Sequence, residues 1–130
     1  MFDRYVFVEN SCKNIEKDNK ATGFELKTYI NYYRGIPCSM IQDIQVKADG
    51  EEVPKDKLLF SPDGIDFFTM EELPTVSGIR WEYDTPGIVR VMKDGGLSKG
   101  THKVFLSVTL RIAYMPGPII GERTRSVVIE

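Results

Sequence analysis

The stretch THKVFLSVTLRIAYM, residues 101–115, decides the fold class, because apolar side chains recur at every second position along it. Side chains of a β-strand point alternately to its two faces, so this period of two is typical of a strand. The even positions are His102, Val104, Leu106, Val108, Leu110, Ile112 and Tyr114. The odd positions are Lys103, Phe105, Ser107, Thr109, Arg111 and Ala113. The pattern predicts a long strand with one buried face and one mixed face.

The rest of the chain follows the same pattern in shorter pieces. TGFELKTYINYY, residues 22–33, alternates in the same way, and TRSVVIE, residues 124–130, reads as a terminal strand. Asp49-Gly50 suits the φ > 0 positions of a tight hairpin turn, and SPDG, residues 61–64, predicts a second hairpin. In 79–92 the apolar positions precede and follow a Pro-Gly turn. Only TMEELPTV, residues 69–76, favours a helical turn, which its proline limits to about one turn.

These segments amount to roughly eight or nine strands with no long helix-period segment, which favours an all-β fold. We expect an antiparallel β-sandwich, with a partly closed barrel as the alternative. The sequence shows no internal repeat, low-complexity tract or linker, so residues 1–130 are expected to form a single domain.

Charge and composition exclude several classes of function. The chain has 17 basic and 19 acidic residues, a net charge of −2 and no long run of either sign, which argues against nucleic acid as a partner. There is no signal-peptide pattern and no apolar run near the ~18 residues of a membrane span, so we expect a cytoplasmic protein with no membrane contact. Cys12 and Cys38 lack CxxC spacing and are expected to be free thiols.

Candidate catalytic groups are few. His102 is the only histidine, and it fits a structural or surface role better than that of a lone general base. The segment KDGGLSKG, residues 93–100, lacks the spacing of a phosphate-binding loop and is expected to be a hairpin loop. Asp63 and Asp66 weakly resemble a calcium loop, but turn chemistry accounts for them better. We therefore predict no catalytic residue and no metal site in this chain.

Two tracts at strand ends stand out instead. The first corner comprises Tyr32, Tyr33, Arg34, Gly35, Ile36 and Pro37. The second corner comprises Tyr114, Met115 and Pro116, followed by Pro118 and Ile119. Tyrosine, methionine and arginine are enriched at protein interfaces. Equally, the tyrosines would cap the core, and the prolines would block pairing at sheet edges.

Three ordered motifs carry a family resemblance: YYRGIP-SMI at the first corner, DGGL-KG-H in 94–102, and LRI-YMP at the second corner. With the opening MFDRYVFVENSCKNI and the segment RWEYD, they cover nearly the whole chain. The chain resembles the small β subunit of bacterial C-glycoside deglycosylation enzymes.

The resemblance implies a β-sandwich subunit of an obligate two-subunit carbon–carbon lyase. The larger α subunit would be a TIM barrel that carries the catalytic residues and a divalent metal ion of the Mn or Mg type. The substrate would be a flavonoid-type C-glycoside already oxidised at C3 of its sugar. That ketone acidifies the C2 proton, so its removal gives an enediolate that a cation can stabilise. Elimination then breaks the bond between C1 and the aryl carbon, which takes up a proton.

On this interpretation the two corners form the interface with the α subunit and a wall of the substrate cleft. Arg34 would then face the partner or substrate, or it would neutralise a nearby carboxylate. Two other functions remain open. One is a stand-alone carbohydrate- or flavonoid-binding module whose tyrosines stack on rings. The other is a lone enzyme with His102 as its base.

Overall fold

A computed structural model describes residues 3–112 and 116–129 of the chain. Every strand pairing in it is antiparallel. One sheet has the order β1 (Lys13–Lys17), β2 (Lys20–Thr28), β9 (Gly87–Met92), β6 (Leu58–Ser61), β7 (Phe68–Thr69). The other has the order β11 (Ile119–Ile129), β10 (Gly100–Leu110), β4 (Ile41–Ala48), β5 (Glu51–Glu52). β3 (Ile36–Pro37) and β8 (Arg80–Trp81) form a separate pair.

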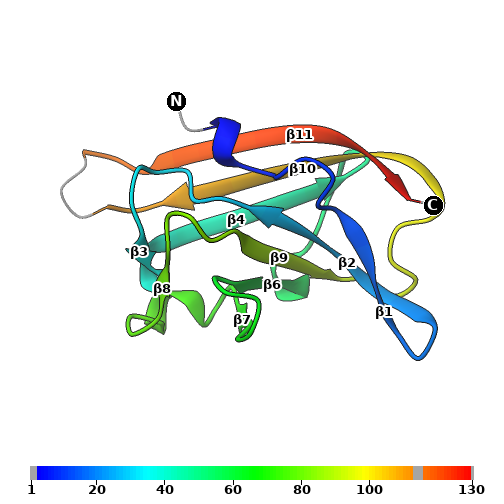
Figure 1. Ribbon diagram of the computed structural model, residues 1–130, viewed down its shortest axis with the longest axis horizontal. Coiled ribbons are helices and arrows are strands. Elements are labelled where there is room, and N and C mark those ends of the chain that lie inside the picture. The colour runs from blue at the N-terminus through cyan, green and yellow to red at the C-terminus, as the bar shows by residue number, and fades with distance from the viewer. Residues whose placement is uncertain (1–2, 113–115, 130) are drawn as a thin grey trace.

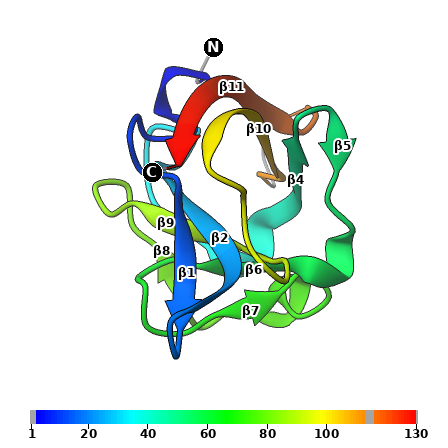
Figure 2. The same cartoon turned by 90° about the vertical axis from the view of Figure 1, so that its right-hand side faces the viewer.

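The two larger sheets lie face to face, as Figures 1 and 2 show. A 3-10 turn, η1 (Asp3–Tyr5), precedes the first strand, and three others lie between strands: η2 (Cys38–Met40), η3 (Lys55–Lys57) and η4 (Leu73–Thr75). The all-β prediction is confirmed, and no sheet of the described residues closes into a barrel. The structure has more strands than predicted because β1, whose residues are all partly or fully exposed, and β3, which has only two residues, show no alternation.

The core lies between the sheets and follows the predicted alternation. From β10 it takes Val104, Leu106, Val108 and Leu110, all fully buried. The facing sheet contributes side chains of β2, β9 and β6: Phe24, Leu26, Val89, Val91, Leu58 and Phe60. Burial of one face of each sheet against the other is the main source of stability in such a sandwich.

The long strands are shorter than their sequence pattern. β2 ends at Thr28, although Ile30 and Tyr32 continue the alternation and are buried. The reason is its neighbour: Thr28 pairs with Gly87, the first residue of β9, so no strand lies beyond it on that side. The chain therefore leaves the sheet at residue 29 and turns into the first corner, where residues 31–34 form a bend.

Two predicted hairpins are confirmed. β4 and β5 pair through Ala48 and Glu51, and the turn residues Asp49 and Gly50 have φ of 52° and 87°. These positive values are why a flexible Asp-Gly pair is found there. β6 and β7 pair through Phe60 and Phe68. In that loop Asp63 Oδ1 accepts hydrogen bonds from the N–H groups of Ile65 and Asp66, which supports the turn-chemistry interpretation.

The predicted hairpin at residues 93–100 is wrong. This segment joins β9 in the first sheet to β10 in the second, so it crosses between the sheets. Alternation shows that a strand has a buried face but not which sheet contains the strand.

The β1–β2 hairpin was not predicted, and its turn residues Asp18 and Asn19 both have positive φ. The helical turn expected in 69–76 is confirmed as η4.

Candidate functional site

The first corner divides into buried and exposed side chains. Tyr32 and Ile36 are 1% and 3% exposed, so their side chains belong to the core. Tyr33 is 60% exposed and Arg34 is also exposed. The rings of Tyr32 and Tyr33 lie 4.3 Å apart between centroids at an interplanar angle of 45°. The tract thus anchors itself with one tyrosine and presents the next to solvent.

Pairing with β8 fixes this corner. Ile36 pairs with Trp81, whose indole is fully buried against the ring of Phe60 and donates to the carbonyl of Thr85 at 3.0 Å. At Gly35 a Cβ atom would lie 2.9 Å from the carbonyl oxygen of Trp81. A side chain here would push the backbone of the corner away from β8, so the close approach requires glycine.

A shallow groove of about 280 Å³ opens beside the corner. It is lined by Arg34, Gly35, Ile36, Pro37, Met40, Arg80 and Ile112, and we call it the corner groove. The guanidinium of Arg80 donates to the carbonyl of Gly35 at 3.0 Å and lies 3.6 Å from a carboxylate oxygen of Glu82. The groove therefore combines an apolar floor with two cationic side chains at its rim.

The segments flanking the second corner lie against the first. Tyr114 and Met115 are outside the described residues, while Pro116 is exposed. Ile112 lines the corner groove, and the N–H of Arg111 donates to the carbonyl of Met40 at 2.8 Å. In Figure 1, β3, β8, the C-terminal end of β10 and the start of β11 lie at the same end of the molecule. The structure thus brings the described ends of the two corner tracts together.

Asn31 joins the two tracts from inside. Its side chain is fully buried, and its amide nitrogen donates to Val108 in β10 at 3.1 Å and to Ile119 in β11 at 3.4 Å. These strands flank the second corner, whereas Asn31 directly precedes the first. A buried amide held by main-chain carbonyls fixes the relative position of the segments it connects.

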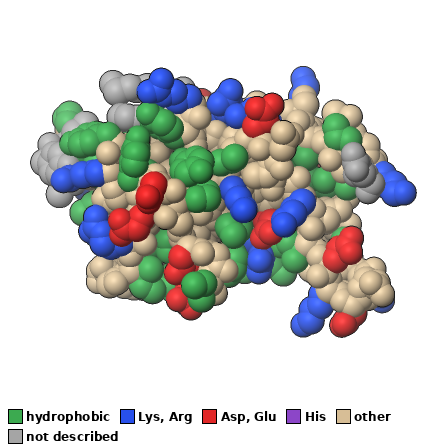
Figure 3. Space-filling view, in the orientation of Figure 1, with side chains coloured by type: hydrophobic (Ala, Val, Ile, Leu, Met, Phe, Trp, Pro, Cys, Tyr) green, Lys and Arg blue, Asp and Glu red, His purple; other side chains and the backbone are tan. Residues whose placement is uncertain are grey.

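Hydrophobic side chains are concentrated on the half of the molecule that carries the corners, on the left in Figure 3. Next to the first corner along the chain, Tyr29 and Ile30 line a second shallow groove of about 330 Å³ together with Tyr5, Tyr83 and Asp84. Tyr29 and Tyr83 are 37% and 43% exposed. Exposed tyrosines in this number are typical of a contact surface.

Sequence reasoning did not identify Met40, Arg80 or Ile112, which line the corner groove, or the buried Asn31, which joins the two corner tracts. Arg80 precedes the buried Trp81 and therefore had to point outward, which is the one signal that indicated it. The other three became visible only once the pairing of distant strands was known.

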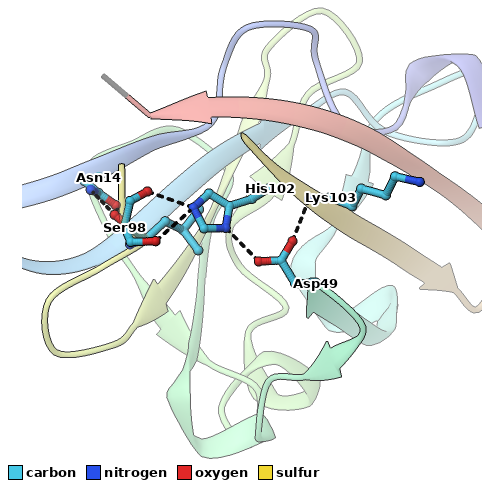
Figure 4. Close-up of polar contacts among 6 residues, drawn as sticks. Asn14, Asp49, Ser98, His102 and Lys103 are labelled. Carbon is cyan, nitrogen blue, oxygen red and sulfur yellow. Dashed lines mark hydrogen bonds and ion pairs between the residues drawn. The ribbon is translucent and has the colours of Figure 1, made fainter. Parts of the chain in front are cut away.

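His102 takes part in a polar network at the opposite end of the sandwich (Figure 4). Its Nδ1 lies 2.7 Å from Oδ2 of Asp49, and its Nε2 lies 2.7 Å from the carbonyl oxygen of Ser98. The other oxygen of Asp49 accepts the N–H of Lys103 at 2.9 Å. Asn14 holds the same crossover segment through two hydrogen bonds with the backbone of Leu97.

This geometry favours a charged imidazole. A carboxylate and a carbonyl oxygen can only accept, so both ring nitrogens of His102 carry hydrogen. The hydrogen bond to Asp49, followed by that to Ser98, raises the pKa of His102, and the hydrogen bond to His102 lowers the pKa of Asp49. An imidazolium with both nitrogens engaged has no lone pair with which to act as a general base. The network ties the 93–100 crossover to the β4–β5 turn.

We expect a pH-dependent contribution of this network to stability. Because the pKa of His102 is raised on folding, its contribution is complete below the unfolded value of about 6.5 and is lost as pH rises through the folded pKa. The free energy of unfolding of the native chain and of His102→Gln should therefore differ at pH 6 and converge at alkaline pH. Since His102 is the only histidine, its NMR titration gives the folded pKa directly. A difference that is constant with pH would refute the charged-imidazole assignment.

The two cysteines are free thiols, as predicted. Burial raises the pKa of Cys12 to about 12 and, with the charge of Asp63 adding to it, that of Cys38 to about 11. Both thiols are therefore poor nucleophiles at neutral pH. Within residues 3–112 and 116–129, no cluster of three or more His, Cys, Asp or Glu side chains has an arrangement that would hold a metal ion. Nor does any helix in that part of the chain have the length and hydrophobicity to cross a membrane.

The described residues form an antiparallel β-sandwich whose strand ends carry exposed tyrosine and arginine side chains on one side. The family model described as C-glycoside deglycosidase beta subunit matches residues 2–114. A relative of the same description from Eubacterium cellulosolvens is 31% identical over 121 residues, which cover 92% of this chain and 81% of that protein. The chain belongs to the family of C-glycoside deglycosidase beta subunits.

Proposed function

We propose that this chain is the small subunit of a heteromeric lyase that cleaves the carbon–carbon bond between sugar and aglycone in 3-oxo-C-glycosides. What supports the proposal is the match to C-glycoside deglycosidase beta subunits along nearly the whole chain, together with the corner groove and the exposed Tyr33 beside it, which we call the corner surface. A beta subunit requires a companion, and the corner surface offers exposed Tyr33, Arg34 and Arg80 for one.

The companion, on this proposal, is a TIM-barrel α subunit that carries the catalytic acid–base residues. A divalent cation of the Mn or Mg type held there would stabilise the negative charge that develops on the enediolate. The role of this chain is structural: it docks through the corner groove and Tyr33, and it completes one wall of the substrate cleft. The flavonoid-type aglycone would be an aromatic group for which exposed tyrosines are suitable neighbours.

Electrostatics at the corner groove favour a partner surface with acidic groups. Arg34 and Arg80 lie on its rim. Arg80 already forms an ion pair with Glu82 and donates a hydrogen bond to the carbonyl of Gly35. Guanidinium groups bind carboxylates through paired hydrogen bonds, and such pairs fix orientation at an interface. Obligate interfaces commonly bury more than ~2,000 Å² and are apolar at their centre. Tyr33, Pro37 and Met40 supply that apolar character.

Binding measurements separate this proposal from the binding-module alternative. The chain should co-purify with the α subunit when the two are co-expressed. In titration calorimetry, the isolated chain should give no heat of binding with a C-glycoside or its 3-oxo derivative at millimolar concentration. Saturable glycoside binding by the isolated chain, without a stable complex, would favour the stand-alone module instead.

A further inference from the structure

β11 is a long edge strand with an open side. It has 11 residues, occupies the end of its sheet and pairs with β10 without any register shift. The other sheet edges of the described chain are protected. β1 has a register shift at Ile15 and Glu16, while β5 and β7 have two residues each. Bulges and shortness are ordinary means of preventing edge pairing, and β11 has neither.

A groove of about 540 Å³ runs along the second half of this edge. One wall is residues 123–128 of β11, and the other is formed by Phe7, Glu9, Asn10 and Cys12. Across the part of the chain that the structure describes, no backbone hydrogen bond links residues 123–128 to a segment other than β10. In an edge strand every second residue directs its N–H and C=O away from the sheet, so this wall offers main-chain donors and acceptors.

Two arginines give the groove its charge. Arg123 and Arg125 are two residues apart on the core-facing side of β11, paired across the sheet with the buried Leu106 and Val104. Arg125 donates to the carbonyl of Phe7 at 2.6 Å, and neither arginine forms an ion pair with another described residue. The single acidic side chain in the lining, Glu9, comes from the opposite wall.

Inward-pointing charges discourage an apolar strand from pairing with an edge, because their desolvation would be uncompensated. The same two guanidinium groups favour a strand whose carboxylates lie opposite them, since opposite charges on neighbouring strands attract. Pairing with a second copy of this chain in the two-fold antiparallel register centred on Thr124 is disfavoured, because it would place Arg123 opposite Arg125. The edge therefore selects for an extended segment with acidic residues at alternate positions.

We propose that residues 123–128 of β11 bind an extended segment of the α subunit that carries carboxylates at positions i and i+2. This segment would add to the four-stranded sheet as a fifth strand. The proposal rests on the proposed function for the existence of that subunit, and it places a second contact outside the corner surface.

Hydrogen exchange of the complex and of the isolated chain tests this. Alternate amides within 123–128 should exchange at least tenfold more slowly in the complex. Arg123→Glu should weaken association about tenfold without lowering the melting temperature of the isolated chain. Lys17→Glu, which reverses an exposed charge on the β1 edge, is the matched control and should leave association unchanged.

Unchanged exchange at 123–128 in a stable complex would overturn the strand-addition proposal and leave the proposed function intact. Slowed exchange in the isolated chain that depends on its concentration would show self-pairing and overturn it as well. Failure of the two chains to associate at all would instead refute the proposed function.

Discussion

Tyr33→Ala should weaken association with the α subunit, whereas Tyr32→Ala should lower the stability of the fold, although the two residues are adjacent. Tyr33 is 60% exposed on the proposed interface, so its truncation should cost about 2 kcal/mol of association, or about thirty-fold in Kd. Tyr32 is 1% exposed, so its truncation should instead lower the free energy of unfolding by about 3 kcal/mol. Titration calorimetry with the α subunit and chemical denaturation of the isolated chain measure the two quantities.

Each variant is the control for the other. Tyr33→Ala should keep nearly native stability, because a side chain that is 60% exposed contributes little to the core, although its ring contact with Tyr32 is lost. If Tyr33→Ala associates as tightly as the native chain, the first corner is not the interface. The tyrosines would then serve only to cap the core, which is the alternative that the sequence left open.

Trp81→Ala should be the most destabilising of the substitutions considered, by about 3–5 kcal/mol. The indole is fully buried, packs edge-on against Phe60 at 4.9 Å and holds the carbonyl of Thr85. Its removal leaves a cavity beneath the β3–β8 pair and so also loosens the first corner. Urea denaturation followed by far-UV circular dichroism measures the loss, because the variant lacks the tryptophan whose fluorescence would otherwise report unfolding.

Ile65→Ala provides the comparison for this loss. Ile65 is a large apolar residue that is 79% exposed, and its truncation should change stability by no more than about 0.5 kcal/mol. A loss below about 1 kcal/mol for Trp81→Ala would mean that the corner does not depend on this anchor.

Much of the fold follows from the sequence because burial on one face of a strand leaves a local pattern. The alternation in 101–115 predicted β10, and Asp49-Gly50 predicted the turn between β4 and β5. Sheet membership is not local, so the 93–100 crossover was mistaken for a hairpin. β1 was missed because its residues are all partly or fully exposed and show no buried face.

The corner surface was predicted in composition but not in geometry. Residue type alone could not show that Tyr32 and Ile36 turn inward whereas Tyr33 and Arg34 turn outward. That outcome depends on the end of β2 at Thr28 and on the pairing of Ile36 with Trp81. The role of Asn31 likewise depends on contacts with Val108 and Ile119, which are remote in sequence.

On the proposed function, this chain contributes to catalysis only as the bound companion of another protein. Turnover of a 3-oxo-C-glycoside by a fixed amount of α subunit, measured while this chain is titrated in, tests it most directly. We predict that the rate of cleavage rises from a negligible value to a plateau as the α subunit becomes saturated with this chain, and that the chain alone gives no cleavage. Cleavage by this chain without the α subunit, or a rate that is indifferent to its addition, would contradict the account.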